Sequence, residues 1–176
     1  EGELVDVPSG TWLQGRFRSF WGVSTHRIAN LRRAVQDWAP QAVIVGGLDA
    51  LPYLVGLQGV VRIWYAADEW VIHHLSQMRP AFGSLREHLY AAAVKGLYER
   101  AHRSVLDRVW VVTDTDRRAM RLITGVPGVD VLPNGVDAEF YTPGPVVDDR
   151  TAVFWGRLDF GPNIQALEWF CRRVWP

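Results

Sequence analysis

The chain has 176 residues, 48% of them hydrophobic, and its 19 basic and 19 acidic side chains give a formal net charge of zero. This length and composition allow one buried core, or one domain and part of a second, and exclude a disordered or low-complexity chain. The balanced charge argues against a polyanion such as nucleic acid as a partner, and the single cysteine, Cys171, excludes an internal disulfide and a thiolate zinc cluster.

The first predicted helix follows an irregular opening. Residues 1–22 are punctuated by glycine and show no clean period, which predicts a loop with one short helix. From Ser24 the period becomes helical, with Ser24 or Thr25 as the cap and Pro40 at the end. The expected buried face of this helix consists of Ile28, Leu31, Val35 and Trp38.

Strands and helices then alternate. Residues 41–48 are a short apolar run closed by Gly46 and Gly47, which predicts a buried parallel strand. A short helical return at 49–57 leads to a second strand at 60–68. Residues 80–108 predict the longest helix, and Ser84 and Glu87 have capping-box spacing within it. The expected apolar face of the long helix consists of Leu85, Leu89, Ala93, Leu97 and Ala101.

Two further strands, at 108–112 and 129–133, enclose a helix that Thr113 or Asp114 caps and that Gly125 and Pro127 stop. Alternation at this spacing is typical of crossover units on a parallel sheet, so the predicted class is α/β with a Rossmann-like parallel sheet and flanking helices. A strand at 151–158 and a helix at 161–176 then predict the opening unit of a second sheet. Pro162 suits the first turn of that helix, and its expected face consists of Ile164, Leu167, Phe170 and Val174.

The segment VLPNGVDAEFYTP, preceded by VWVVTDTDRRAMR and followed by AVFWGRLDFGPNIQALEWFCRRVWP, carries a family resemblance. These motifs resemble the family 4 glycosyltransferases, two-domain enzymes of the GT-B fold, and the tail is similar to bacterial exopolysaccharide-associated sugar transferases. The resemblance covers most of the chain from about Gln41 onward. It implies a partial N-terminal, acceptor-side Rossmann-like domain at 1–140, an interdomain linker at 141–150 and the start of a C-terminal nucleotide-sugar-binding domain at 151–176. Asn134, Gly135 and Asp137 would form the hinge.

The resemblance also implies an internal fragment that is inactive alone, because the two glutamates typical of the family's donor site would lie beyond Pro176.

A donor-phosphate site is expected in WGRLDFGPN. A nucleotide-sugar leaves a diphosphate, which fixed cations and helix amide groups stabilise in metal-free enzymes. Spacing alone favours an ordinary Gly-Arg turn before a capped helix, whereas the resemblance favours phosphate binding at Gly156, Arg157 and Asn163. Asn163 stands where many relatives have a second cation, so binding would depend more on Arg157 and on amides starting at Gly161.

Acceptor-side candidates follow the second and first predicted strands. Asp68 and Glu69 lie where open parallel sheets bind ligands, and the resemblance makes Asp68 the first candidate. The alternative, that Asp68 is only a helix N-cap, carries about equal weight. Gly46 and Gly47 replace the histidine of many relatives; they either admit an acceptor or only make the turn, and the turn is favoured.

No metal and no other cofactor is expected. His73 and His74 are neighbours on a helix and point in different directions, so they make no metal pair. Asp114 and Asp116 are interpreted as a cap and a surface acid. The basic clusters RR and RAHR are interpreted as solvated faces, with contact to anionic lipid carriers as the alternative.

The predicted function is metal-independent hexosyl transfer, with retention, from a nucleotide-sugar to a saccharide or lipid-linked acceptor in bacterial cell-surface polysaccharide synthesis. The alternative is a non-catalytic Rossmann-like binding or interaction module, in which residues 151–158 complete the first sheet. An epimerase-like relative is a third hypothesis. The acidic start and the lack of an apolar run of roughly 20 residues predict a cytoplasmic protein, with the inner face of the membrane as an alternative. Exposed strand edges would permit a homo-oligomer.

Overall fold

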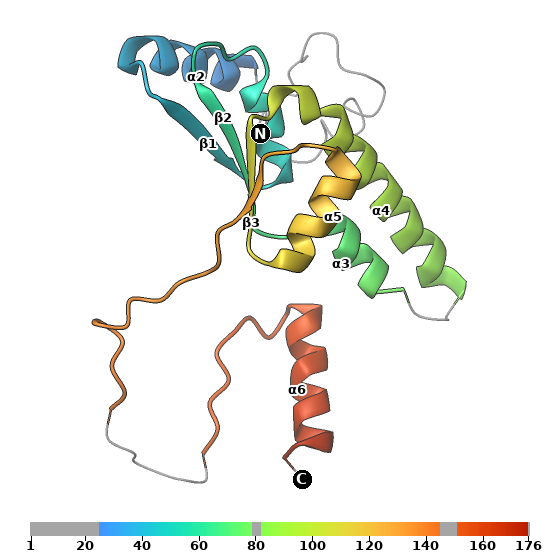
Figure 1. Ribbon diagram of the computed structural model, residues 1–176. Helices are drawn as coiled ribbons and strands as arrows, with labels where there is room; N and C mark the ends of the chain where they lie inside the picture. The colour runs from blue at the N-terminus through green and yellow to red at the C-terminus, as the bar shows by residue number, and fades with distance from the viewer. Residues whose placement is uncertain (1–24, 79–81, 145–150, 176) are drawn as a thin grey trace. The chain divides into compact units, whose positions relative to one another are not determined.

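The computed structural model describes residues 25–78, 82–144 and 151–175. The chain divides into two compact units, Glu1–Gly135 and Val136–Pro176. The first unit contains a four-stranded, all-parallel sheet with flanking helices, so the α/β class is confirmed and the arrangement is consistent with a Rossmann-like fold (Figure 1). The strands, in their order across the sheet, are β1 Ala42–Gly46, β2 Val61–Ala66, β3 Arg108–Val111 and β4 Val129–Val131.

Helices precede and connect these strands. They are α2 Thr25–Trp38 before β1, η1 Leu48–Leu54 between β1 and β2, α3 Trp70–Ser76 and α4 Phe82–Ala101 between β2 and β3, followed by η2 Arg103–Val105, and α5 Asp114–Thr124 between β3 and β4. Ser24, one of the two predicted caps of α2, lies outside the described residues. Among the described residues, no helix is both long and apolar enough to cross a membrane.

The core lies on one face of the sheet. Because neighbouring strands are consecutive in the chain, right-handed crossovers place all the connecting helices on the same face. Trp64, Val109 and Val129 lie in register across three strands on this face, and each is at most 1% exposed. Leucines of η1 and Met120 of α5 complete the cluster. Each buried side chain of this size contributes about 1.5–3 kcal/mol to folding, so this layer fixes the sheet.

The opposite face of the sheet is only partly covered. Ile44 of β1 is 54% exposed and Val61 of β2 is 43% exposed, although Ile63, the register partner of Ile44, is buried. The prediction of a buried strand at 41–48 is therefore wrong for one face. The physical reason is the strand order, which leaves that face without a connecting helix among the described residues.

The predicted signals at both ends of α5 are confirmed. The Thr113 hydroxyl accepts a hydrogen bond from the Asp116 backbone N–H at 3.1 Å and donates one to the Asp116 carboxylate at 2.6 Å. Gly125 ends the helix in the left-handed region, at φ 72°, where a side chain would be strained. Thr113 is thus the cap, and Asp114 is the first helical residue.

The expected apolar face of α4 is wrong. Its leucines Leu85, Leu89 and Leu97 are 37%, 46% and 51% exposed, while Glu99 is completely buried. A Cβ added at Gly96 would lie 3.3 Å from Val71 of α3, so the small residue selects the face that can approach a neighbour closely. Apolar periodicity alone identifies a stripe on the helix but not the face that meets the fold.

Two smaller predictions on the helices also fail. Trp38 was placed on the buried face of α2 but is 82% exposed, whereas Ile28 is buried as expected. Ser84 is not the N-cap of α4, because the helix already begins at Phe82.

The second unit contains α6 Gly161–Arg173, with Pro162 in its first turn as predicted. Residues 151–158, predicted as a strand, form none. A strand needs a partner for its backbone N–H and C=O groups, and the described part of this unit contains no other extended segment paired with it.

Candidate functional site

Four strand ends bring polar residues to one edge of the sheet. Gly47 follows β1, Asp68 follows β2, Thr113 follows β3 and Asn134 follows β4, and parallel strands place these carboxyl ends together. The Tyr65 hydroxyl donates a hydrogen bond to the Asn134 side-chain oxygen at 3.4 Å, which connects β2 to the predicted hinge. Tyr65 was not predicted, although its place near the carboxyl end of β2 is the signal that could have identified it.

Gly47 makes a turn at this edge. Its φ of 84° lies in the left-handed region, and its carbonyl accepts a hydrogen bond from the Trp64 indole N–H at 3.1 Å. A Cβ at Gly47 would lie 2.7 Å from the Asp49 carboxylate, whereas a Cβ at Gly46 would meet no atom within 4 Å. The favoured interpretation as a turn agrees with this geometry, and the turn requires glycine at the second position only.

Asp68 and Glu69 have different environments. Glu69, not Asp68, is the N-cap of α3, and its carboxylate accepts hydrogen bonds from the backbone N–H groups of Val71 and Ile72. Glu69 is 5% exposed, and burial raises the pKa of its carboxyl. The interpretation of Asp68 as the N-cap is therefore wrong, and its exposed side chain stands at the sheet edge without that structural role.

A chain of hydrogen bonds joins α3 to α4. The Lys95 ammonium lies 2.8 Å from Nε2 of His74, and Nδ1 of His74 lies 3.3 Å from Nδ1 of His88. An ammonium only donates, so Nε2 of His74 accepts, and a neutral His74 carries its proton on Nδ1 and donates it toward His88. Lys95 also lies 4.0 Å from the centroid of the Trp70 ring. Burial, then the Lys95 charge, lowers the pKa of His74 to about 4.

Glu99 lies one turn after Lys95 on α4 and is completely buried. Neither of its carboxyl oxygens has a hydrogen-bond partner among the described residues. Burial raises the pKa of Glu99 to about 8, and the nearby Glu69 adds to this effect while Lys95 opposes it. Sequence reasoning missed Glu99, because the apolar stripe of α4 predicted the opposite face as buried.

The remaining predicted acids and histidines have structural contacts. Asp114, interpreted as a cap, is the first helical residue and pairs with Arg117 at 2.6 Å, so that interpretation is wrong; Asp116, interpreted as a surface acid, accepts a hydrogen bond from the cap Thr113. The His73 ring packs edge-on against Trp70. Within residues 25–78, 82–144 and 151–175, no group of three or more His, Cys, Asp or Glu side chains could hold a metal ion.

The second unit places the predicted donor-phosphate residues together. The Arg157 guanidinium makes two hydrogen bonds to the Asp159 carboxylate, at 2.9 and 2.7 Å, and this ion pair is exposed. The Asn163 side-chain amide donates to the Arg157 carbonyl at 2.9 Å and so ties the turn to the first turn of α6. Gly156 lies inside this turn, where a Cβ would be 2.9 Å from the Asn163 amide. The hydrogen bond to Asp159 raises the pKa of Arg157, which therefore remains a cation.

The N-terminus of α6 offers one backbone donor for an anion. Its N-cap, Phe160, has no side-chain hydrogen bond, Pro162 has no N–H, and the Asn163 N–H donates to the Phe160 carbonyl at 3.0 Å. The Gly161 N–H is therefore the backbone donor that the first turn can offer. Arg157 precedes this group by one turn of chain. The positive end of the helix is therefore close in sequence to Arg157, and the Asn163 side chain bonds to the Arg157 carbonyl. The Asp159 carboxylate competes with an anion for the Arg157 guanidinium.

The predicted hinge residue Asp137 makes a tight turn in the same unit. Its carboxylate accepts hydrogen bonds from the backbone N–H groups of Glu139 and Phe140, at 3.1 and 2.9 Å. This turn directly follows the division of the chain after Gly135.

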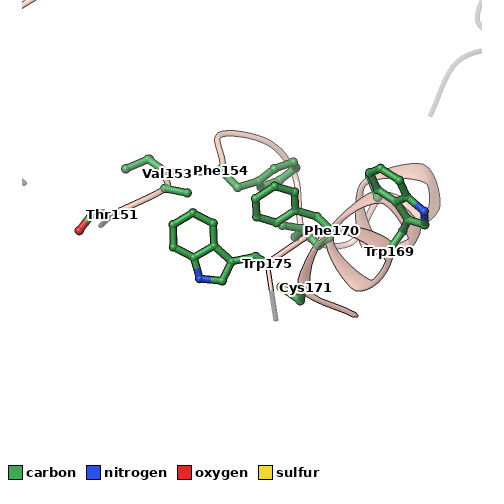
Figure 2. A pocket seen from close by; sticks show the side chains of 10 residues that line it. Thr151, Val153, Phe154, Trp169, Phe170, Cys171 and Trp175 are labelled. Carbon is green, nitrogen blue, oxygen red and sulfur yellow. The ribbon is translucent and has the colours of Figure 1, made fainter. Parts of the chain in front are cut away.

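An open apolar groove of about 660 Å³ lies on the other part of α6 (Figure 2). Figure 2 shows the rings of Phe154, Phe170 and Trp175 close together there, and the last two stack at 6.0 Å. The groove is not lined by Arg157 or Asn163, so it is distinct from the predicted phosphate site.

Comparison of the chain with known protein families, with curated proteins and with solved structures finds no match.

Proposed function

We propose that the chain is part of a GT-B glycosyltransferase that transfers a sugar, with retention, from a nucleotide-sugar to a saccharide or lipid-linked acceptor. The first unit would hold the acceptor at the carboxyl edge of its sheet, and the turn before α6 would hold the donor diphosphate. No metal ion takes part in the proposed binding, because Arg157 and the N-terminal end of α6, through the Gly161 N–H, would supply the positive charge. The family assignment depends on the resemblance of the motifs.

The observation that carries the proposal is the turn from Gly156 to Asn163. It combines a guanidinium, an amide side chain and a helix N-terminus within eight residues, which is the chemistry that a diphosphate needs. The competing Asp159 carboxylate is exposed, and an exposed ion pair is weak enough for a phosphate to replace it. A nucleotide would thus exchange one anionic partner of Arg157 for another.

The acceptor side of the proposal is supported by the polar groups at the sheet edge. The exposed Asp68 carboxylate can accept hydrogen bonds from sugar hydroxyls, and the Tyr65 and Asn134 pair offers further polar atoms beside it at the ends of β2 and β4. Glu69 is excluded from direct contact because it is buried and caps α3. We therefore assign acceptor binding to Asp68 and not to Glu69.

Titration calorimetry of the purified protein with UDP, GDP, ADP, CDP and dTDP tests the donor site. We expect one nucleotide to bind, and Arg157→Ala to weaken its binding by about tenfold to a hundredfold, the range of a charge-assisted hydrogen bond. Arg172→Ala is the matched control, because Arg172 is also exposed on α6 and pairs with Glu168. Absence of nucleotide binding by the folded protein would contradict the proposal and favour the binding-module alternative.

The binding-module alternative has a structural requirement of its own. It needs residues 151–158 to extend the first sheet, whereas the enzyme needs them to open a second one. Detection by NMR of strand pairing between this segment and β1 or β4 would favour the alternative.

A further inference from the structure

The starting observation is a buried carboxyl group with no partner. Glu99 is 0% exposed, and both of its oxygens lack a hydrogen bond within the described part of the chain. An ionised carboxylate in such a place would be very costly, so Glu99 is held as the neutral acid. Because Glu99 is completely buried, a catalytic role in direct contact with a substrate is not proposed.

Two charged groups act directly on Glu99: Glu69, the N-cap of α3, and Lys95 of α4. Further titratable groups act on neighbouring residues: His73 and His88 act on His74, Asp116 acts on Glu69, Asp49 acts on Tyr98, and the His102 ring bonds to the Tyr98 carbonyl. Lys95 is the cation that lowers the pKa of Glu99, while Glu69 raises it. Any negative charge on Glu99 would therefore attract Lys95 first.

In the structure, the Lys95 ammonium contacts residues of α3. The ammonium bonds to His74 at 2.8 Å and lies over Trp70, so one side chain of α4 contacts two residues of α3. None of the residues of α3 is buried, and seven residues are too few for a stable isolated helix. Packing against α4, which includes the close approach of Val71 to Gly96, is what keeps α3 in place.

We propose that Lys95 is a proton-controlled latch between α3 and α4: when Glu99 releases its proton to solvent, the Lys95 ammonium turns from His74 and Trp70 to the new carboxylate, and α3 loosens. The two positions of Lys95 compete, because Lys95 and Glu99 are one turn apart on α4 and already interact electrostatically, so a new charge on Glu99 would draw the ammonium away from His74 and Trp70. Burial lowers the pKa of Lys95, and a charge on Glu99 opposes this, so ionisation of Glu99 favours the Lys95 cation; the proton that the latch releases is that of Glu99.

The consequence reaches the carboxyl edge of the sheet. The N-cap of α3 is Glu69, and Asp68 lies immediately before it. Loosening of α3 changes the position of both acids at the end of β2. The latch does not depend on the proposed glycosyl transfer, because it uses contacts within the first unit only.

The pH window follows from the two groups that titrate. The pKa of Glu99 is raised to about 8, so ionisation of Glu99 opens the latch as the pH rises toward that value. The pKa of His74 is lowered to about 4, so His74 stays a neutral acceptor for Lys95 until the pH falls well below 6.5. The latch is therefore closed in the intermediate range, from weakly acid to neutral pH.

Amide hydrogen exchange of the whole chain, corrected for the intrinsic effect of pH, tests the latch. We expect the protection of residues 70–76 to fall by about tenfold from about pH 6.5 to about pH 7.5, as linkage to one proton requires. Amides of α5 that exchange through local opening of α5 should show no such change, because that opening does not release the Glu99 proton. In Glu99→Gln, which keeps a neutral side chain of the same size, protection of α3 should not depend on pH. The control is Glu87→Gln, an exposed glutamate on the same helix, which should behave as the wild type.

A second variant keeps the test decisive if Glu99→Gln does not fold. In Lys95→Met the latch is absent, so α3 should be less protected than in the wild type at pH 6.5 and should show a much smaller change with pH. Protection of α3 that is independent of pH in the wild type would overturn the proposal. The same pH dependence in the wild type and in either the Glu99 or the Lys95 variant would also overturn it.

Discussion

The Lys95 ammonium, 2.8 Å from Nε2 of His74, defines the protonation state of the imidazole beside it. A proton on Nε2 would face the Lys95 cation, and Nε2 could then no longer accept a hydrogen bond from the ammonium. His74 is therefore neutral, with its proton on Nδ1. One lysine thus determines the tautomer of a histidine on another helix and, through Nδ1, orients a second histidine, His88.

Removal of the Lys95 charge should make His74 more basic. In Lys95→Met we expect the pKa of His74 to rise from about 4 toward its ordinary value of 6.5 without reaching it, because burial, the larger cause of the shift, remains. NMR titration of the histidine ring protons measures this value. An unchanged pKa of His74 in the folded variant would mean that Lys95 does not hold the position described.

Glu99 of α4 and His74 of α3 make the free energy of unfolding depend on pH in opposite directions. The Glu99 carboxyl has a pKa of about 8 when folded against 4.5 when unfolded, so the folded chain binds more protons in between, and its stability falls as the pH rises through that window. The His74 pKa is about 4 when folded against 6.5 when unfolded, so stability falls as the pH drops from 6.5 to 4. Of these two groups, Glu99 is the one whose protonation changes the free energy of unfolding between pH 6.5 and pH 8.

Urea denaturation of the wild type and of Glu99→Gln across this range should separate the two linkages. We expect the free energy of unfolding of the wild type, relative to the variant, to fall by on the order of 2 kcal/mol from about pH 6.5 to about pH 8. Below pH 4.5 the difference should become constant, because both states of the wild type then hold the proton. Parallel profiles for the two proteins would contradict a buried neutral Glu99.

The two adjacent glycines after β1 should respond differently to alanine. Gly47→Ala should lower the free energy of unfolding by about 1–2 kcal/mol, because φ of 84° is strained for any residue with a Cβ. Gly46→Ala should change it by less than about 0.5 kcal/mol, since Gly46 has open space around its Cβ position and no positive φ. Thermal or chemical denaturation of both variants decides between them, and equal effects would contradict the turn at Gly47.

The arrangement of the sheet could be predicted from the sequence because strand signals are local. Short apolar runs at 41–48, 60–68, 108–112 and 129–133 became four parallel strands, and Thr113 and Gly125 limited a helix as their chemistry requires. What failed depended on partners far away in the chain. The face of α4 that is buried is set by Gly96 against Val71, and no period in the α4 sequence encodes that contact.

The candidate site shows the same limit. The residues at strand ends could be placed from the parallel topology, and the turn at Arg157 from its Gly and Pro neighbours. That Glu69, and not Asp68, caps α3 could not be predicted, because either carboxylate can cap a helix and only the backbone at the end of β2 selects Glu69. The strand expected at 151–158 failed because an apolar pattern predicts a strand only where a partner strand is present to pair with it.

The Asp159 carboxylate should oppose donor binding. It occupies the Arg157 guanidinium through two hydrogen bonds, so a phosphate must displace it. In Asp159→Asn we expect the nucleotide that binds the wild type to bind about three- to tenfold more tightly, because the competing charge is removed while the size of the side chain is kept. Calorimetry measures the affinity, and Glu168→Gln, which alters the partner of Arg172, is the control. Weaker binding in Asp159→Asn would indicate that this carboxylate positions Arg157 for the nucleotide.

The proposed function depends most on the turn before α6, which would bind the diphosphate of a nucleotide-sugar. Titration of the isotopically labelled protein with the nucleoside diphosphate that binds, followed by backbone amide NMR, tests this binding site most directly. We predict that the largest shifts occur at residues 156–163, where the guanidinium turn and the first amide groups of α6 lie, and that Arg157→Ala removes them. Shifts confined to the groove of Phe170 and Trp175, or to the edge of the first sheet, would contradict the claim.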